Sequence, residues 1–123
     1  LLKEKIDTHN VKVYLVNTGW CGGSAQSGAK RISIKNTRAM ITSILDGSIE
    51  KSVFDIDPIF GLSIPMTVNK VETKVLNPRQ SWSNKNLYDD SAMALAQLFI
   101  DNFKTYGKEV LYLENSGPTP INV

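Results

Sequence analysis

The residues best suited to chemistry are Arg31, Ile32 and Thr37, which lie where a glycine-rich segment, 19–30, leads into a predicted helix. The first backbone N–H groups of a helix have no partner, and the helix dipole is positive at that end. The Arg31 guanidinium can bind a phosphate or lie over a flat ring, Ile32 offers an apolar surface to a base, and Thr37 carries a hydroxyl about one turn into the helix. The pattern predicts a nucleotide site, and the alternative is an ordinary strand–loop–helix connection with a solvated basic pair.

The glycines match neither of two common phosphate-binding motifs. No Gly-Lys-Ser/Thr triplet occurs, so the segment is not a Walker A loop. Gly19, Gly22 and Gly23 also have the wrong spacing for the dinucleotide-binding fingerprint. The site prediction therefore depends on the helix terminus and not on a phosphate-loop motif.

The other candidate residues have simpler explanations. His9 is the only histidine and has no Ser or Cys near it in sequence, and the single Cys21 excludes an internal disulfide and a multi-cysteine zinc site. Asp55 and Asp57 would share one face of a strand, where a solvated face competes with a metal pair. Asp89–Asp90 falls in the first turn of a predicted helix, where the dipole favours negative charge. We assign no catalytic residue and no metal ligand.

The composition bounds the class of protein. The chain has 123 residues and a formal charge of +2, with basic and acidic residues interspersed, which argues against nucleic-acid and membrane-surface partners. No apolar run approaches the ~20 residues of a membrane span, and one cysteine fits a reducing, cytoplasmic setting. We expect one domain, and the start at Leu1 without a Met indicates part of a longer chain.

The elements that must position the site follow from periodicity and caps. A helix end is expected over 1–10, and Val11–Val16 reads as a strand with both faces covered, as in an α/β sheet. Ser33 is a predicted N-cap and Gly47 a C-terminal stop. The helix between them should have one apolar face, made of Ile34, Ile41 and Leu45 together with Met40 and Ile44.

The second half of the chain is predicted to be extended and then helical. Residues 53–64 read as an extended segment interrupted by Pro58 and Gly61, with alternation continuing over Phe60, Leu62 and Ile64 until Pro65 ends it. A loop-rich stretch, 68–80, follows, and a last helix should run from Asn86 to Tyr106 before Gly107. Its buried stripe is predicted to be Ala92, Leu95, Ala96, Phe99, Phe103 and Tyr106. The tail, 108–123, is expected to be partly disordered beyond 110–113.

Five runs of residues occur in an order typical of one family. They are 13–20 followed by Gly22-Gly23, 30–35 with 37–39 behind it, 57–62, 76–79 with Trp82, and 98–103. Together they resemble the C-terminal region of ATP-dependent phosphoenolpyruvate carboxykinases over most of 11–106. A departure lies in 24–29, which is one residue longer than the common form and has Ala29 where Gly is usual.

The resemblance implies a reaction, and it implies which parts of the active site lie in this chain and which lie upstream of it. The family converts oxaloacetate and ATP into phosphoenolpyruvate, carbon dioxide and ADP, with magnesium and manganese assisting phosphoryl transfer. Its phosphate loop, metal ligands and oxaloacetate-binding arginines lie upstream of this region, and none of those motifs appears here. By resemblance, Arg31 and Ile32 flank the adenine and ribose of ATP, and Thr37 contacts the base.

We therefore expect 1–123 to be a single partial α/β domain, a fragment of the C-terminal nucleotide-binding domain with few strands and two main helices. It would belong to a cytoplasmic lyase, a decarboxylase of gluconeogenesis, and supply the nucleoside side of the ATP site. The fragment alone is predicted to be inactive and to self-associate through exposed edges. The alternative is a stand-alone, non-catalytic nucleotide-binding or interaction module.

Overall fold

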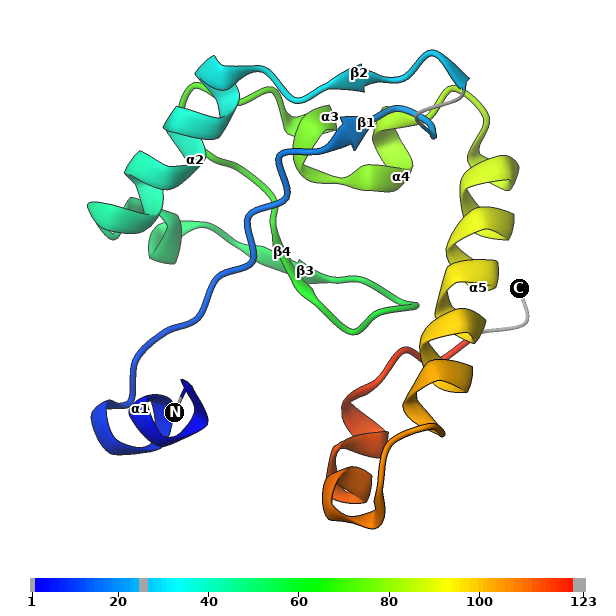
Figure 1. The fold of residues 1–123 in the computed structure, drawn as a ribbon. Helices are drawn as coiled ribbons and strands as arrows, with labels where there is room; N and C mark the ends of the chain where they lie inside the picture. The colour runs from blue at the N-terminus through cyan, green and yellow to red at the C-terminus, as the bar shows by residue number, and fades with distance from the viewer. Residues whose placement is uncertain (1, 25–26, 121–123) are drawn as a thin grey trace.

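The computed structural model describes residues 2–24 and 27–120 (Figure 1). Its elements are α1 Leu2–His9, β1 Trp20–Cys21, β2 Lys30–Arg31, α2 Ile34–Leu45, η2 Ser48–Lys51, β3 Phe54–Ile56, β4 Ser63–Pro65, α3 Thr73–Leu76, α4 Pro78–Ser81, α5 Lys85–Phe103 and η3 Lys108–Ser116. The strands form two small antiparallel sheets, β1–β2 and β3–β4. Helices combined with small sheets agree with the predicted α/β class, and α2 and α5 are the two long helices expected.

The strand predicted over Val11–Val16 is wrong. Residues 11–18 form no strand, and Figure 1 shows them as a bare trace between α1 and β1. Both faces are open instead of covered, since Val13 is 59% exposed and Leu15 is 84% exposed. A strand exists only where a second strand supplies backbone partners, and no segment in the described part of the chain does so here.

The segment predicted as a loop, 19–30, is partly a hairpin. Trp20 lies opposite Arg31 and Cys21 opposite Lys30. The Ile32 N–H donates to the Gly19 carbonyl at 3.0 Å and so extends the ladder by one pair. The hairpin leads the chain into the N-terminus of α2.

Gly22 joins this hairpin to α4. Its N–H donates to Ser81 Oγ at 3.2 Å, and its φ of 85° lies in the left-handed region. A Cβ at this position would stand 3.0 Å from the Ser81 carbonyl oxygen. Both the backbone conformation and the close approach therefore require glycine.

Helix α2 begins and ends as predicted. Ser33 Oγ accepts a hydrogen bond from the Asn36 N–H at 3.1 Å, and Gly47 adopts a left-handed φ of 73° just after the helix. The predicted apolar face is only partly confirmed, because Met40 and Ile44 are half-buried while Ile34, Ile41 and Leu45 are exposed. Ser43 is the buried residue of this helix.

The β3–β4 hairpin accounts for the extended segment predicted around Phe54 and Ile64, and Pro65 ends it as expected. Residues 57–62 make a turn, so the predicted alternation through Phe60 and Leu62 is wrong. Asp57 causes the turn, because its Oδ1 accepts hydrogen bonds from the N–H groups of Ile59 at 3.0 Å and Phe60 at 2.7 Å.

Two short helices, α3 and α4, replace much of the predicted loop over 68–80. Asn77 caps α4 by accepting a hydrogen bond from the Gln80 N–H at 3.2 Å, and Pro78 stands at the first helical position. Proline is preorganised for that position, since its missing N–H would have no partner there. The cap and the proline together are a sufficient local signal for this helix.

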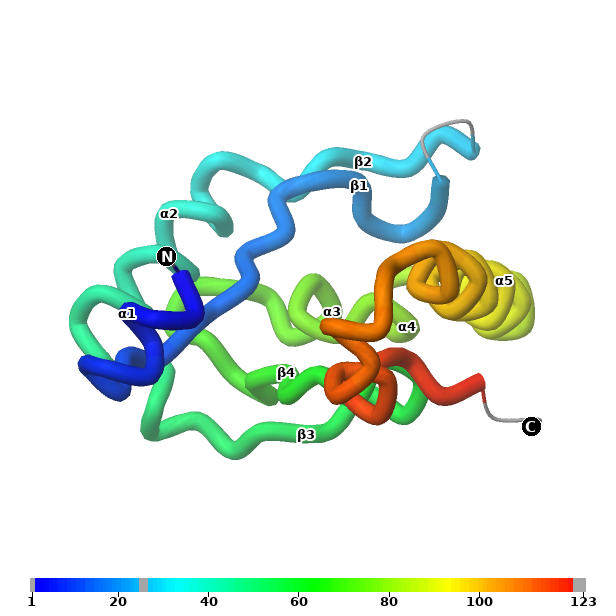
Figure 2. Tube along the Cα trace, turned by 60° about the horizontal axis from the view of Figure 1, so that its bottom comes forward, coloured from blue at the N-terminus to red at the C-terminus, as the bar shows by residue number. Residues whose placement is uncertain are grey.

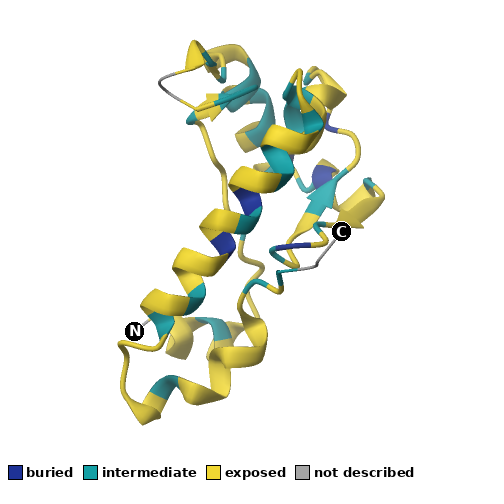
Figure 3. Cartoon of the chain, turned by 90° about the vertical axis from the view of Figure 1, so that its right-hand side faces the viewer, coloured by how far each residue is buried: buried dark blue, intermediate teal, exposed yellow. Residues whose placement is uncertain are grey.

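Helix α5 contributes two of the three buried residues in a small hydrophobic cluster. Ala92 and Ala96 are buried against Ile59 from the β3–β4 turn, and Phe60 meets Phe99 edge to face with ring centroids 6.4 Å apart. The rest of the predicted stripe is more open, and Figure 3 shows burial confined to short stretches of the helix. The helix ends at Phe103, earlier than the predicted Tyr106.

The tail returns to the β3–β4 turn. After η3 it runs beside that turn, as Figure 2 shows, and the Thr119 N–H donates to the Ile59 carbonyl at 2.8 Å. Within the described residues, buried hydrophobic side chains are confined to Ile49, Ile59, Val68, Ala92 and Ala96. Much apolar surface consequently faces solvent.

Candidate functional site

Arg31 is held at the surface by its strand partner. It is exposed on β2, and its guanidinium carbon lies 5.4 Å from the centre of the Trp20 ring on β1. No ion pair joins Arg31 to an acidic side chain in the described ranges, 2–24 and 27–120. The guanidinium is therefore free to meet an anionic or planar ligand.

Ile32 follows β2 and is half-buried. It lines a hollow of about 520 Å³ together with apolar side chains that include Trp20, Met40, Ile44 and Trp82. The lining also includes exposed residues of the 11–18 segment. Ile32 thus presents one apolar edge to this hollow, and its contact with a flat ring stays a prediction.

Thr37 lies in the first turn of α2 and is half-buried. Its N–H donates to the Ser33 carbonyl at 3.0 Å, which leaves the side-chain hydroxyl as the group that could meet a ligand. Neither Thr37 nor Arg31 lines the hollow beside Ile32. The structure places the three predicted residues along one connection, from β2 to the first turn of α2, without enclosing them in one pocket.

The charge at this end of α2 suits an anion. Lys30, Arg31 and Lys35 are all exposed, and the first turn of the helix contains no acidic residue. The helix dipole adds positive potential at the same place. A phosphorylated ligand would therefore be attracted to the approach to α2.

The other candidate residues have structural explanations. The Asp57 carboxylate accepts hydrogen bonds within the turn that follows it, and Asp55 is exposed on β3. His9 is exposed at the end of α1, and Cys21 is a half-buried free thiol. No group of three or more His, Cys, Asp or Glu side chains is arranged to hold a metal ion among the described residues. These residues therefore do not fit a metal centre by themselves.

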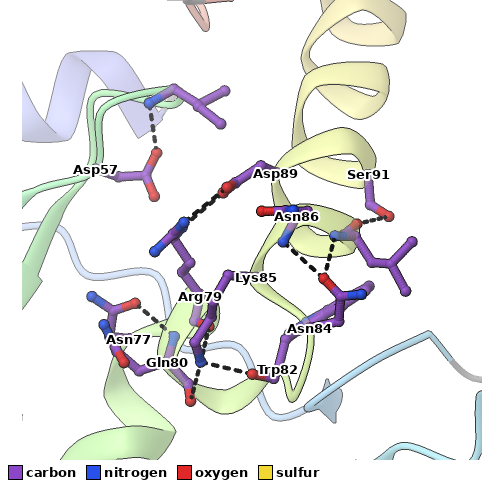
Figure 4. A network of polar contacts seen from close by, with 12 residues as sticks. Asp57, Asn77, Arg79, Gln80, Trp82, Asn84, Lys85, Asn86, Asp89 and Ser91 are labelled. Atoms are coloured by element: carbon purple, nitrogen blue, oxygen red, sulfur yellow. Dashed lines mark hydrogen bonds and ion pairs between the residues drawn. The ribbon is translucent and has the colours of Figure 1, made fainter. Parts of the chain in front are cut away.

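The explanation predicted for Asp89–Asp90 is wrong. Helix α5 starts at Lys85, and its first turn contains no acidic residue. Asp89 instead pairs with Arg79, and this hydrogen bond holds the pKa of the carboxyl below its ordinary value (Figure 4).

Lys85 stands beside this pair. Its Nζ donates to the carbonyls of Arg79, Gln80 and Trp82 at 2.9, 3.1 and 2.7 Å (Figure 4). All three ammonium donors are thus directed at the end of α4. The cluster stabilises the α4–α5 junction and has no free group for catalysis.

A smaller hollow of about 250 Å³ lies between the β3–β4 turn and α5, bordered by Asp57, Arg79, Tyr88 and Met93. Burial raises the pKa of the Tyr88 hydroxyl, and the nearby Asp57 and Asp89 carboxylates add to the effect. Tyr88 also packs edge to face on Trp82, with centroids 5.7 Å apart. Its phenol is protonated at neutral pH and serves packing.

Sequence reasoning did not predict the contact between Trp20 and Arg31. The position of Trp20 next to glycines indicated only a loop. Trp20 and Arg31 are paired by a strand register that joins residues on both sides of the turn, and neighbouring residues in the sequence do not reveal that register. The available signal was an aromatic residue before the glycines and a basic pair after them, since side chains directly opposite in a hairpin interact.

Comparison with known proteins gives one consistent family. Residues 1–74 match the family model described as Phosphoenolpyruvate carboxykinase.

No helix in the described part of the chain is long and apolar enough to cross a membrane.

Curated relatives extend the match over nearly the whole chain. Proteins named Phosphoenolpyruvate carboxykinase (ATP) from Sulfurimonas denitrificans and Campylobacter lari are 51% and 49% identical over 109 and 120 residues, which is 89% and 96% of this chain. One from Caldanaerobacter subterraneus is 45% identical over 118 residues. The aligned residues make up 20%, 23% and 22% of these relatives, so the chain spans about a fifth of their length.

Proposed function

Because this chain belongs to the ATP-dependent phosphoenolpyruvate carboxykinase family, we propose that it is the C-terminal part of an enzyme that converts oxaloacetate and ATP into phosphoenolpyruvate, carbon dioxide and ADP. Identity of about half the residues over nearly the whole chain supports the family reaction for the intact protein. We place the enzyme in the cytoplasm, in gluconeogenesis. Within it, 1–123 forms a partial nucleotide-binding domain.

In this proposal the chain supplies the nucleoside end of the ATP site. Arg31 and Ile32 flank adenine and ribose, and Thr37 contacts the base. The observation that carries the assignment is their common position between β2 and the first turn of α2, where exposed basic side chains and the helix dipole favour an anionic ligand.

The chemical step belongs to the rest of the enzyme. Phosphoryl transfer is catalysed mainly by positioning and by neutralising charge, and divalent magnesium and manganese supply much of that neutralisation. We expect this chain to orient the nucleotide and the metal ligands to lie in the rest of the enzyme, since no group of three or more His, Cys, Asp or Glu side chains is arranged for a metal ion among the described residues.

The test is steady-state kinetics of Arg31→Ala in the intact enzyme. Loss of a charged hydrogen bond or stacking partner should raise KM for ATP by about tenfold or more, while KM for oxaloacetate changes little. Lys51→Ala, which removes an exposed basic side chain on η2, is the matched control and should leave both constants unchanged. An unchanged KM for ATP in a folded Arg31→Ala enzyme would contradict the proposal.

A further inference from the structure

We propose that Trp20 is a positioning residue that holds the Arg31 guanidinium ready for the nucleotide. The inference rests on the proposed function, because it assigns a second residue to the same nucleoside contact. Its basis is the cross-strand pair in which the guanidinium carbon lies 5.4 Å from the centre of the Trp20 ring. Trp20 was not among the residues expected to form the site.

Backbone pairing sets this contact. Trp20 and Arg31 are directly opposite in the antiparallel β1–β2 ladder, so their side chains leave the same face of the hairpin. The Ile32–Gly19 hydrogen bond extends the ladder beyond them at 3.0 Å. On the other side, Gly22 anchors the hairpin to Ser81 of α4. The two side chains therefore meet because the hairpin is held at both ends.

The contact reduces the freedom of a flexible arginine. Arg31 is exposed and has no acidic partner in the described part of the chain, so without Trp20 its long side chain would sample many rotamers. An indole under the guanidinium selects rotamers that lie over the ring, and such preorganisation lowers the entropic cost of binding. A guanidinium that lies over one indole face still has N–H donors, and a second face of its own, for a base or a phosphate.

Geometry also explains why an aromatic residue is needed. An aliphatic side chain of similar size could fill the space on β1, yet it has no π face to attract a cation. Trp20 is itself about half exposed, so apolar burial alone is a weak reason for a tryptophan here. Its role is accordingly assigned to the guanidinium that it faces.

The experiment is a double-mutant cycle on KM for ATP in the intact enzyme. Trp20→Leu should raise KM for ATP about two- to fivefold, the effect of losing an exposed cation–π contact, with a much smaller change in kcat and in KM for oxaloacetate. Trp20→Phe keeps a ring and should give a smaller increase. In an Arg31→Ala background, Trp20→Leu should add nothing.

The outcomes separate this inference from the proposed function. If Arg31→Ala leaves KM for ATP unchanged, the nucleoside assignment fails. Two results would overturn this inference alone and show that Trp20 is only structural, provided that Arg31→Ala raises KM for ATP. One is that Trp20→Leu leaves KM for ATP unchanged. The other is that Trp20→Leu raises KM for ATP equally with and without Arg31. Should Trp20→Leu not fold, Trp20→Met, which also lacks a ring, carries the same cycle, and an unchanged KM for ATP or an equal effect in the Arg31→Ala background would overturn the inference.

Discussion

Arg79 and Asp89 are joined by two parallel hydrogen bonds, from Nε to Oδ1 at 2.8 Å and from Nη2 to Oδ2 at 2.9 Å. The pair links α4 to α5 across the turn that Lys85 also braces (Figure 4). A bidentate arrangement is the geometry in which an arginine–carboxylate pair is most specific. It fixes the direction in which α5 leaves the short helix.

This pair should make stability depend on pH at the acid end. The hydrogen bond from Arg79 lowers the pKa of Asp89, so its stabilisation is complete above the ordinary carboxyl pKa of about 3.9 and is lost as pH falls through the lower folded value. Asp89→Asn should lower the unfolding midpoint at neutral pH, and the difference from wild type should shrink toward about pH 3 and at high salt.

Urea unfolding of the intact protein at a series of pH values measures this effect. Asp90→Asn is the matched control on the same helix, because Asp90 is exposed and makes no ion pair among the described residues. A difference between wild type and Asp89→Asn that stays constant down to the acid limit would show that the charge of Asp89 is irrelevant.

The core should resist enlargement at Ala96. This side chain has 0% exposure and packs with Ile59 and Ala92, so Ala96→Leu has no space to enter. We expect a loss of about 1–3 kcal/mol in the free energy of unfolding. Ala94→Leu, on the exposed side of α5, should stay within about 0.5 kcal/mol of wild type. Denaturant unfolding compares the two, and equal effects would mean that this face of α5 is not packed.

Thr37 should control base preference. Thr37→Ala removes one hydroxyl in the first turn of α2 and should reduce discrimination between ATP and other nucleoside triphosphates by about two- to tenfold, the effect of one hydrogen bond. The ratio of kcat/KM values for ATP and GTP in the intact enzyme measures it. Thr42→Ala, exposed further along the same helix, is the control. Identical ratios for both variants would argue against a base contact at Thr37.

The isolated 123-residue chain should have no carboxykinase activity. The described residues hold no metal-ligand cluster, and the sequence has no phosphate-loop motif. A coupled assay with oxaloacetate, ATP, magnesium and manganese should read background at every protein concentration. Metal-dependent turnover that co-purifies with the chain would refute this.

The isolated chain should self-associate through 11–18. Leu15 is 84% exposed in a segment whose backbone has no strand partner among the described residues, so a second copy can pair with it. Light scattering should show mass above the monomer at high concentration, and Leu15→Lys should reduce it. Leu45→Lys removes an equally exposed leucine, 83%, from α2 and should have less effect. A monomer at all concentrations would contradict the prediction.

Local signals predicted local structure. Ser33 and Gly47 mark the two ends of α2 because a cap depends on the few backbone groups next to it. Likewise Pro65 ends β4, since proline cannot donate to a ladder. The α/β class and the two long helices follow from such signals.

Features that depend on distant partners could not be predicted. Apolar alternation over 11–16 is typical of a strand, but pairing requires another strand, and the described chain has none beside it. The contact between Trp20 and the Arg31 guanidinium depends on hairpin register, which the glycine-rich turn between them does not reveal. For the same reason the candidate residues Arg31, Ile32 and Thr37 could be named from the sequence, whereas the contact of Trp20 with Arg31 could not.

The hydrogen bond from Thr119 to Ile59 has a consequence for the order of folding. The β3–β4 turn that carries Ile59 closes over a few residues and can form early, while the tail must span all of α3, α4 and α5 before it reaches the same carbonyl. Closing so long a loop costs more chain entropy than closing a hairpin, so the hydrogen bond from Thr119 is the more expensive one to form. The segment that carries Thr119 should therefore dock after the hairpin and α5 have come together and should detach before they separate.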